Sequence, residues 1–278
     1  DTERNYPKIN SPIPGSPAEE VGLRPNDIIY EVEGESTYGM DLDKVVSLIK
    51  GEEGTTVRMT IYRDGEYLEM AVQRRQVEIP TVEQEMLGDG MAYIRIIEFD
   101  EVTPSQFEQA LETSRGSGMK GLVLDLRGNP GGSVNAVVDI ARMLLPEGLV
   151  VYTEDKYGKR EQYSCDGSNE FELPLVVLID GNSASASELL SGAIQDYEKG
   201  TLVGTTTFGK GIVQQMLTLR DGSAVKITIS SYFTPKGRNI HGIGIDPDVV
   251  CPFDGEAYYG SGYDNQLEKA KQVLADMM

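Results

Sequence analysis

The apolar and polar positions of residues 1–75 predict a small β-rich module. Short runs at 28–32, 56–62 and 67–72 are bounded by glycine, asparagine and aspartate, which is typical of strands joined by tight turns. A short helix is expected at 15–22. Within 41–50 the apolar residues fall on one face of a helix, with Gly51 as its stop: Leu42, Val45, Val46 and Ile49.

Residues 76–278 have a different pattern, in which apolar runs alternate with helical segments. Strands are predicted at 91–97, 121–126, 174–179 and 201–204, and helices at 103–114, 133–145, 187–197 and 265–277. A hairpin is expected around 220–222. Continuous apolar strands separated by helices indicate an α/β domain whose sheet is covered by helices.

Composition restricts the partners of this 278-residue chain, which is long enough for one large or two smaller domains. It has 45 acidic and 25 basic residues, a net charge of −20, which repels nucleic acid and anionic lipid and also favours solubility. No apolar stretch reaches the roughly 18 residues that span a bilayer. The first residues lack the features of a signal peptide, so we expect a mature or cut form of a longer protein.

A serine flanked by small residues is the clearest chemical signal. Residues 181–188 read Gly-Asn-Ser-Ala-Ser-Ala-Ser-Glu, with Ser185 at the head of a predicted helix. Lys210 follows 25 residues later between two glycines, and His241 is the only histidine, in a predicted turn. This pattern predicts a Ser–Lys nucleophilic dyad. Ordinary helix capping is the alternative for serines 183, 185 and 187.

A lysine base requires an unusual environment. Near its ordinary pKa the amine is protonated at neutral pH, so the pKa must fall by about 3 units before the amine can accept a proton. Apolar neighbours in the chain, Phe208, Ile212 and Val213, are expected to desolvate Lys210. Gln214 is placed to accept a hydrogen bond from the amine.

Two glycine-rich segments have competing interpretations. Residues 125–132 join a buried strand to a helix, where exposed amides favour an oxyanion, although a plain tight turn also fits. Residues 204–211 almost spell a phosphate-binding loop. However, Gly211 replaces the required serine or threonine, and a predicted strand follows instead of a helix, so a nucleotide site is rejected.

The first module resembles a PDZ domain of the kind found in proteases. The resemblance is carried by Gly15-Ser16-Pro17-Ala18, Gly22-Leu23 and Asn26-Asp27-Ile28-Ile29. It implies a peptide groove with apolar contacts from Val45, Val46 and Ile49. Residues 8–13 look like the strand that follows the carboxylate-binding loop, so the first strand and that loop are expected to be missing.

With all three motifs in order, the chain resembles the C-terminal processing (tail-specific) peptidases. That resemblance implies a crotonase-like α/β protease core over 76–278 behind an N-terminally truncated PDZ domain over 1–75. It implies Ser185 as nucleophile, Lys210 as base and Gln214 as the residue that orients the lysine. Gly131 and Ala186 would form the oxyanion hole, with Glu188, Asp196 and Thr207 in support.

The resemblance also implies an endopeptidase, without metal or cofactor, that cleaves near the C-termini of unfolded or exported proteins. Homo-oligomers are possible, and the expected location is outside the cytoplasm, in a bacterial cell envelope, with membrane contact only through a missing N-terminal anchor. One alternative is an inactive PDZ adaptor that binds protein tails. Another is an acyl-thioester enzyme on the same fold, which needs the oxyanion glycines but not Ser185 or Lys210.

Two cysteines, Cys165 and Cys251, have neither zinc nor redox spacing. They form one disulfide or stay apart as small apolar residues.

Overall fold

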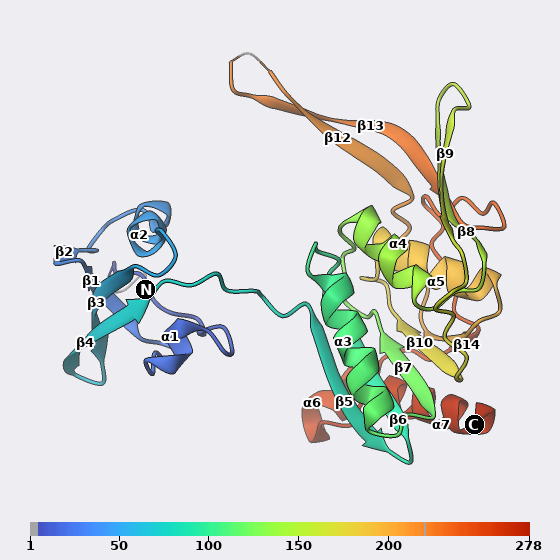
Figure 1. The fold of residues 1–278 in the computed structure, drawn as a ribbon, viewed down its shortest axis with the longest axis horizontal. Coiled ribbons are helices and arrows are strands. Elements are labelled where there is room, and N and C mark those ends of the chain that lie inside the picture. The colour runs from blue at the N-terminus through green and yellow to red at the C-terminus, as the bar shows by residue number, and fades with distance from the viewer. Residues whose placement is uncertain (1–4, 220) are drawn as a thin grey trace. The chain divides into compact units, whose positions relative to one another are not determined.

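The computed structural model describes residues 5–219 and 221–278, which form two compact units, Asp1–Ile79 and Pro80–Met278. The boundary lies in an extended segment, 74–81, that is mostly without regular structure. Figure 1 shows the elements of both units.

The first unit is a four-stranded antiparallel sheet with two short helices. Its order is β2 (Glu35–Ser36), β1 (Ile28–Val32), β3 (Thr56–Arg63) and β4 (Glu66–Gln73). The helices are α1 (Pro17–Glu20) and α2 (Leu42–Ile49). Alternate residues of β3 point into the core, where Val57, Met59 and Ile61 pack with Val32 and Val45.

The segment 8–13 was expected to be a strand, and that expectation is wrong for most of it. Only Lys8 forms a β-bridge, to Ile28, supported by a hydrogen bond from the Ile9 amide to the Asp27 carbonyl. Pro12 and Pro14 lack the amide hydrogens that a longer ladder needs.

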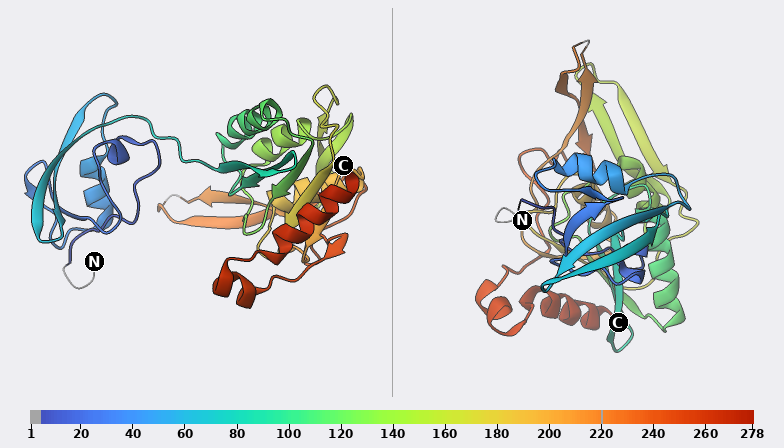
Figure 2. Two further views of the ribbon diagram at one scale, coloured as in Figure 1. Left: turned by 90° about the horizontal axis from the view of Figure 1, so that it is seen from below. Right: turned by 90° about the vertical axis from the view of Figure 1, so that its left-hand side faces the viewer.

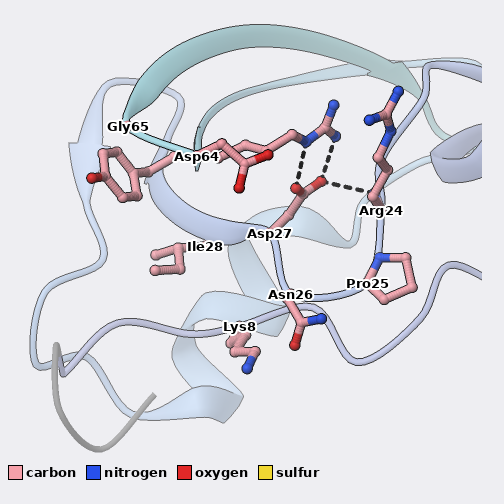
Figure 3. A pocket seen from close by; sticks show the side chains of 10 residues that line it. Lys8, Arg24, Pro25, Asn26, Asp27, Ile28, Asp64 and Gly65 are labelled. Carbon is pink, nitrogen blue, oxygen red and sulfur yellow. Dashed lines mark hydrogen bonds and ion pairs between the residues drawn. The ribbon is translucent and has the colours of Figure 1, made fainter.

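The first unit also contains a polar pocket of about 610 Å³, shown in Figure 3. Beside it, Arg63 binds the buried Asp27 with two nitrogens, each 2.7 Å from a carboxylate oxygen. Burial opposes the charge of Asp27, but hydrogen bonds from Arg63 and from the Arg24 amide outweigh it and hold the pKa of this carboxyl below its ordinary value. This ion pair joins the end of β3 to the turn before β1.

The second unit is built on a six-stranded sheet. The order is β14 (Val249–Val250), β11 (Thr201–Gly204), β10 (Leu175–Ile179), β7 (Gly121–Asp125), β6 (Met91–Ile96) and β5 (Val82–Gly88). All neighbours are parallel except β5 and β6. The buried strands 121–126, 174–179 and 201–204 of the prediction are therefore confirmed as β7, β10 and β11, within a residue or two at the ends.

Helices cover both faces of this sheet (Figures 1 and 2). On one face lie α3 (Thr103–Gly116), α4 (Val134–Arg142) and α5 (Ala186–Asp196), which share the largest core with the sheet. On the other lies α7 (Asn265–Met277), whose Ala270 and Leu274 pack against Val123, Val176 and Leu178. The short helix α6 (Gly255–Ser261) precedes it. Because both faces are covered, β10 is apolar at every position and β7 is apolar from Leu122 to Leu124.

A second, antiparallel sheet has the order β12 (Ile212–Thr218), β13 (Ala224–Phe233), β8 (Gly148–Asp155) and β9 (Arg160–Cys165). The predicted hairpin is confirmed as β12–β13, although Arg220 in its turn lies outside the described residues. Both cysteines are free: Cys165 is buried and Cys251 is half-buried. No helix in the described part of the chain is both long and apolar enough to cross a membrane.

Candidate active site

Ser185 lies on a strained turn between β10 and α5. Its backbone has φ 57° and ψ −113°, a conformation that residues with a side chain rarely adopt, at a typical cost of about 1–3 kcal/mol. A sharp turn of this kind between strand and helix presents a nucleophilic serine in many hydrolases. The side chain of Ser185 is half-buried, whereas its neighbours Ala184 and Ala186 are buried. Hydrogen bonds in the loop before Ser185, and the bond from the Ser185 amide to Glu188, hold this strained conformation.

The loop before Ser185 is fixed by side-chain hydrogen bonds. One carboxylate oxygen of Asp180 accepts the amides of Gly128, Asn182 and Ser183, each at 3.0 Å. The Ser183 hydroxyl donates to the Leu126 carbonyl at 2.8 Å. These bonds attach the loop before Ser185 to the turn after β7, which contains Gly131, one of the two predicted oxyanion residues.

Gly131, in that turn, lies directly against Ser185. A methyl group placed on Gly131 would lie 2.6 Å from the Ala184 carbonyl oxygen, 2.8 Å from Ser185 Cβ and 2.9 Å from the Ala186 nitrogen. Its φ of 100° also favours glycine. The structure therefore brings together Gly131, Ser185 and Ala186. Ala186 is the first residue of α5, so its amide lies outside the intrahelical ladder.

Asn129 organises both loops and was not predicted. Its side chain is fully buried; the amide group donates to the Ile96 carbonyl at 2.9 Å, and Oδ1 accepts the Gly131 amide at 2.8 Å. Its backbone carbonyl accepts the Ala184 amide and the Ser187 hydroxyl, both at 3.0 Å. The Gly131 amide, predicted to bind an oxyanion, is therefore engaged by Asn129 in this structure.

Glu188 connects the serine to the lysine. This fully buried carboxylate accepts four hydrogen bonds. Oε2 accepts the backbone amides of Ser185 and Lys210, both at 2.8 Å. Oε1 accepts the Thr207 hydroxyl at 2.6 Å and the Gly209 amide at 2.7 Å. Since each amide nitrogen is 2.8 Å from the same oxygen, those of Ser185 and Lys210 are at most twice that distance, 5.6 Å, apart.

The side chain of Lys210 is less constrained than its backbone. It is half-buried, and its amine has neither an ion pair nor a hydrogen bond within the described part of the chain. Gln214 lies on β12, is exposed, and its side chain has no hydrogen bond to any described residue. The structure thus brings the Lys210 backbone to Ser185 but gives no contact between Gln214 and the lysine. His241 is exposed, and its amide donates to Asn239 Oδ1.

The two remaining predicted supporting residues have different positions. Thr207 is buried beside Glu188, and its hydroxyl also accepts the Ile245 amide at 2.7 Å. Asp196 ends α5, eleven residues after Ser185, which at 1.5 Å per residue is about 16 Å along the helix. It binds Arg238 at 2.6 Å and the Lys236 amide at 2.8 Å. Asp196 therefore fixes the far end of α5 rather than contacting Ser185.

A second buried ion-pair cluster supports the turn after β7. Arg127 binds Asp125 at 2.6 Å and Asp264, at the start of α7, at 2.9 Å. Tyr93 donates its hydroxyl to Asp125 at 2.8 Å, and its burial together with that carboxylate raises its pKa. Burial disfavours the charge of Arg127, but Asp125 and Asp264 outweigh it and raise the pKa of the guanidinium. The turn after β7 is thereby tied to the start of α7, on one face of the sheet.

Comparison with known proteins now decides the family. Residues 90–251, more than half of the chain, match the sequence model of peptidase family S41. The chain belongs to peptidase family S41. Residues 8–63 match a PDZ domain, as predicted. The predicted mixed α/β protease fold, following a PDZ domain in the sequence, is confirmed.

Similar S41 proteins are longer than this chain. The carboxyl-terminal-processing protease of Synechocystis sp. is 37% identical over 280 residues, 98% of this chain but 66% of that protein. The carboxy-terminal processing protease of Bacillus subtilis is 36% identical over 243 residues, 87% of this chain and 52% of that protein. The solved photosystem II D1 C-terminal processing protease matches with a TM-score of 0.58 and 37% identity, covering 89% of this chain and 69% of the other.

The predicted peptide contacts in the PDZ domain are only partly at the surface. Val45 has 1% of its surface exposed and belongs to the core, so it is corrected from a peptide contact to a core residue. Ile49 is partly buried against the same core, and Val46 is exposed. Consecutive residues of a helix point about 100° apart, which explains why Val45 and Val46 differ. Val46 therefore has the most accessible side chain of the three.

The chemistry-bearing residues that the sequence analysis missed are Asn129, Asp180, Ser183 and the Arg127 cluster. An asparagine inside a glycine-rich turn was the available signal for Asn129, and an aspartate directly after an apolar strand was the signal for Asp180. Within the described residues no group of three or more His, Cys, Asp or Glu side chains is arranged to hold a metal ion.

Proposed function

We propose that this S41 chain is a serine endopeptidase that uses Ser185 and Lys210 to cleave near the C-termini of unfolded or exported proteins. The observation that carries the proposal is the shared oxygen of Glu188, which binds the backbone amides of both residues. Ser185 and Glu188 also form a capping box at the start of α5, so the bond from the Lys210 backbone amide is the part of this arrangement that helix capping does not require.

The proposed reaction assigns each of these residues a step. Ser185 Oγ attacks the scissile carbonyl while the neutral Lys210 amine takes the hydroxyl proton. The resulting oxyanion lies beside the Ala186 amide and the Gly131 amide, and for the latter it competes with Asn129 Oδ1. Collapse of the tetrahedral intermediate breaks the C–N bond, and Lys210 passes its proton to the leaving amine. Water, activated by the same lysine, then hydrolyses the acyl-enzyme.

The substrate class rests on the PDZ domain and on the relatives. Proteins named for C-terminal processing share 36–37% identity with this chain. In this chain a PDZ domain precedes the S41 match. The chain would therefore select substrates through their C-terminal tails. Because we propose that its substrates are exported proteins, we also propose that the protein acts outside the cytoplasm. Assembly into homo-oligomers is part of the same proposal.

Labelling with a fluorophosphonate probe, which reacts with activated serines, tests this function. We expect covalent labelling of wild-type protein at Ser185 and cleavage of an unfolded protein, and neither with Ser185→Ala. Binding of C-terminal tails by a protein that neither labels nor cleaves would instead support the PDZ adaptor.

A further inference from the structure

The strand that leaves the active site has an unusually uncharged free edge. β12 begins two residues after Lys210 and is the terminal strand of its sheet. Among the described residues it pairs only with β13. From Gly211 to Leu219 the sequence is Gly-Ile-Val-Gln-Gln-Met-Leu-Thr-Leu, without a charged residue or a proline, although a quarter of the chain is charged. Edge strands are normally protected from pairing by charges, proline or bulges.

The outer part of this edge is exposed and regular. Met216 is 65% exposed, Leu217 42% and Leu219 47%. Figure 1 shows the β12–β13 hairpin extending away from the helices of the second unit. The one bulge lies at Val213/Gln214, close to Lys210, and beyond it β12 and β13 pair residue by residue. A segment of uninterrupted backbone therefore remains available along β12.

We propose that β12 is a docking edge for the substrate polypeptide, which adds to this sheet as a further strand and so reaches Ser185. This rests on the proposed function. Backbone hydrogen bonds select for extended, unpaired chain, because residues of folded helices and sheets already use these groups. The absence of charge along β12 favours weakly charged segments. Gln215 and Leu217 share one face of β12, so every second residue of the added strand would lie beside them. Their cross-strand partners Ile227 and Val225 are on β13, one strand further in.

Binding to the catalytically inactive Ser185→Ala protein tests the edge without depending on catalysis. The probe is a fluorescent peptide of alternating valine and serine, followed by anisotropy. Leu217→Lys, added to Ser185→Ala, puts a charge on the edge strand and should weaken binding about tenfold or more. Val225→Lys, at the cross-strand partner of Leu217 one strand further in, should change binding less than about twofold. Leu217→Thr, a neutral strand former, should retain binding and shows that the hairpin still folds.

N-methylation of the peptide, one amide at a time, gives the second readout. Strand addition predicts that binding is lost at every second position only, because alternate amides point toward and away from β12. Equal effects of Leu217→Lys and Val225→Lys, or equal effects of methylation at all positions, would overturn the proposal. So would a dimer of the wild-type chain that Leu217→Lys dissociates while peptide binding stays unchanged, since the edge would then pair with a second copy. Failure of the proposed function is recognised separately, as absence of fluorophosphonate labelling in the protein with Ser185 intact.

Discussion

The serine side and the lysine side of the proposed active site are built differently. Around Ser185, the residues Ser183, Ala186 and Glu188 are each fully buried, and the loop is attached to the turn after β7 by side-chain hydrogen bonds. Beyond Lys210, residues 214–218 of β12 are exposed. Glu188 fixes the backbone at Lys210 but not its amine. The serine side is thus preorganised in the absence of substrate, whereas the lysine side has freedom to adjust when a substrate binds.

Substitution of Lys210, on the less constrained side of the site, should reduce activity the most. Lys210→Arg keeps the charge, but guanidinium stays protonated and cannot act as base, so turnover should fall by about 10⁴-fold or more. Steady-state cleavage of an unfolded protein measures this. Lys226→Arg, the same change on exposed β13, should be silent. Near-normal proteolysis by Lys210→Arg would exclude the dyad and make His241 the remaining candidate base.

Breaking the connection between the two sides should have the next largest effect. Glu188→Ala leaves four donors without their acceptor, so activity should fall on the order of 10²-fold and stability by about 2–4 kcal/mol. Cleavage assays and urea unfolding measure the two losses. Retention of full activity in a destabilised protein would show that Glu188 stabilises the fold without positioning the site.

Asn129→Asp tests the preorganised side at nearly constant volume. The carboxylate still accepts the Gly131 amide but cannot donate to the Ile96 carbonyl. The turn that contains Gly131 should therefore shift, and kcat should fall about tenfold. KM should remain unchanged, because Asn129 lies outside β12, where we propose that the substrate docks. Asn169→Asp, an exposed match, controls for the added charge. A change confined to KM would place Asn129 in substrate binding instead.

Gln214→Ala should have a smaller effect, because the Gln214 side chain makes no hydrogen bond to any described residue and the substitution therefore breaks none in the substrate-free protein. If it orients the lysine only once substrate is bound, kcat should fall a fewfold, on the order of one hydrogen bond. Gln162→Ala, the same change at an exposed position of β9, should retain full activity. Identical kcat values for the two variants would remove Gln214 from the site.

The smallest effect on the active site should follow from breaking the Asp27–Arg63 pair in the PDZ domain. The pKa of Asp27 is lowered in the folded protein, so the pair contributes stability above the unfolded pKa, near 3.9, and loses it as pH falls through the folded value. Asp27→Asn should destabilise the first unit at pH 7 by about 3 kcal/mol and reduce this acid sensitivity. Urea unfolding at pH 7 and pH 3 measures it, and fluorophosphonate labelling of Ser185 should be unchanged.

The central strands and most helices could be predicted from sequence because their signals are local. Continuous apolar runs predicted β7, β10 and β11, and helical spacing predicted α2. The strands β2, β5, β8, β9 and β14 and the helix α6 were missed. β5 alternates polar and apolar residues over a short stretch, and β8 follows a predicted helix so closely that its apolar run has no clear boundary. These strands are defined by pairing with partners elsewhere in the chain.

The sequence by itself determined the family resemblance, the two modules and the candidates Ser185 and Lys210, because each depends on a short motif. Only the tertiary structure placed the Lys210 backbone within 5.6 Å of the Ser185 backbone and showed Asn129 holding the Gly131 amide. It also separated buried Val45 from exposed Val46, and assigned Asp196 to the far end of α5. The physical reason is that motifs specify which groups are present, whereas hydrogen bonds between residues 22 to 58 positions apart form only when the chain is folded.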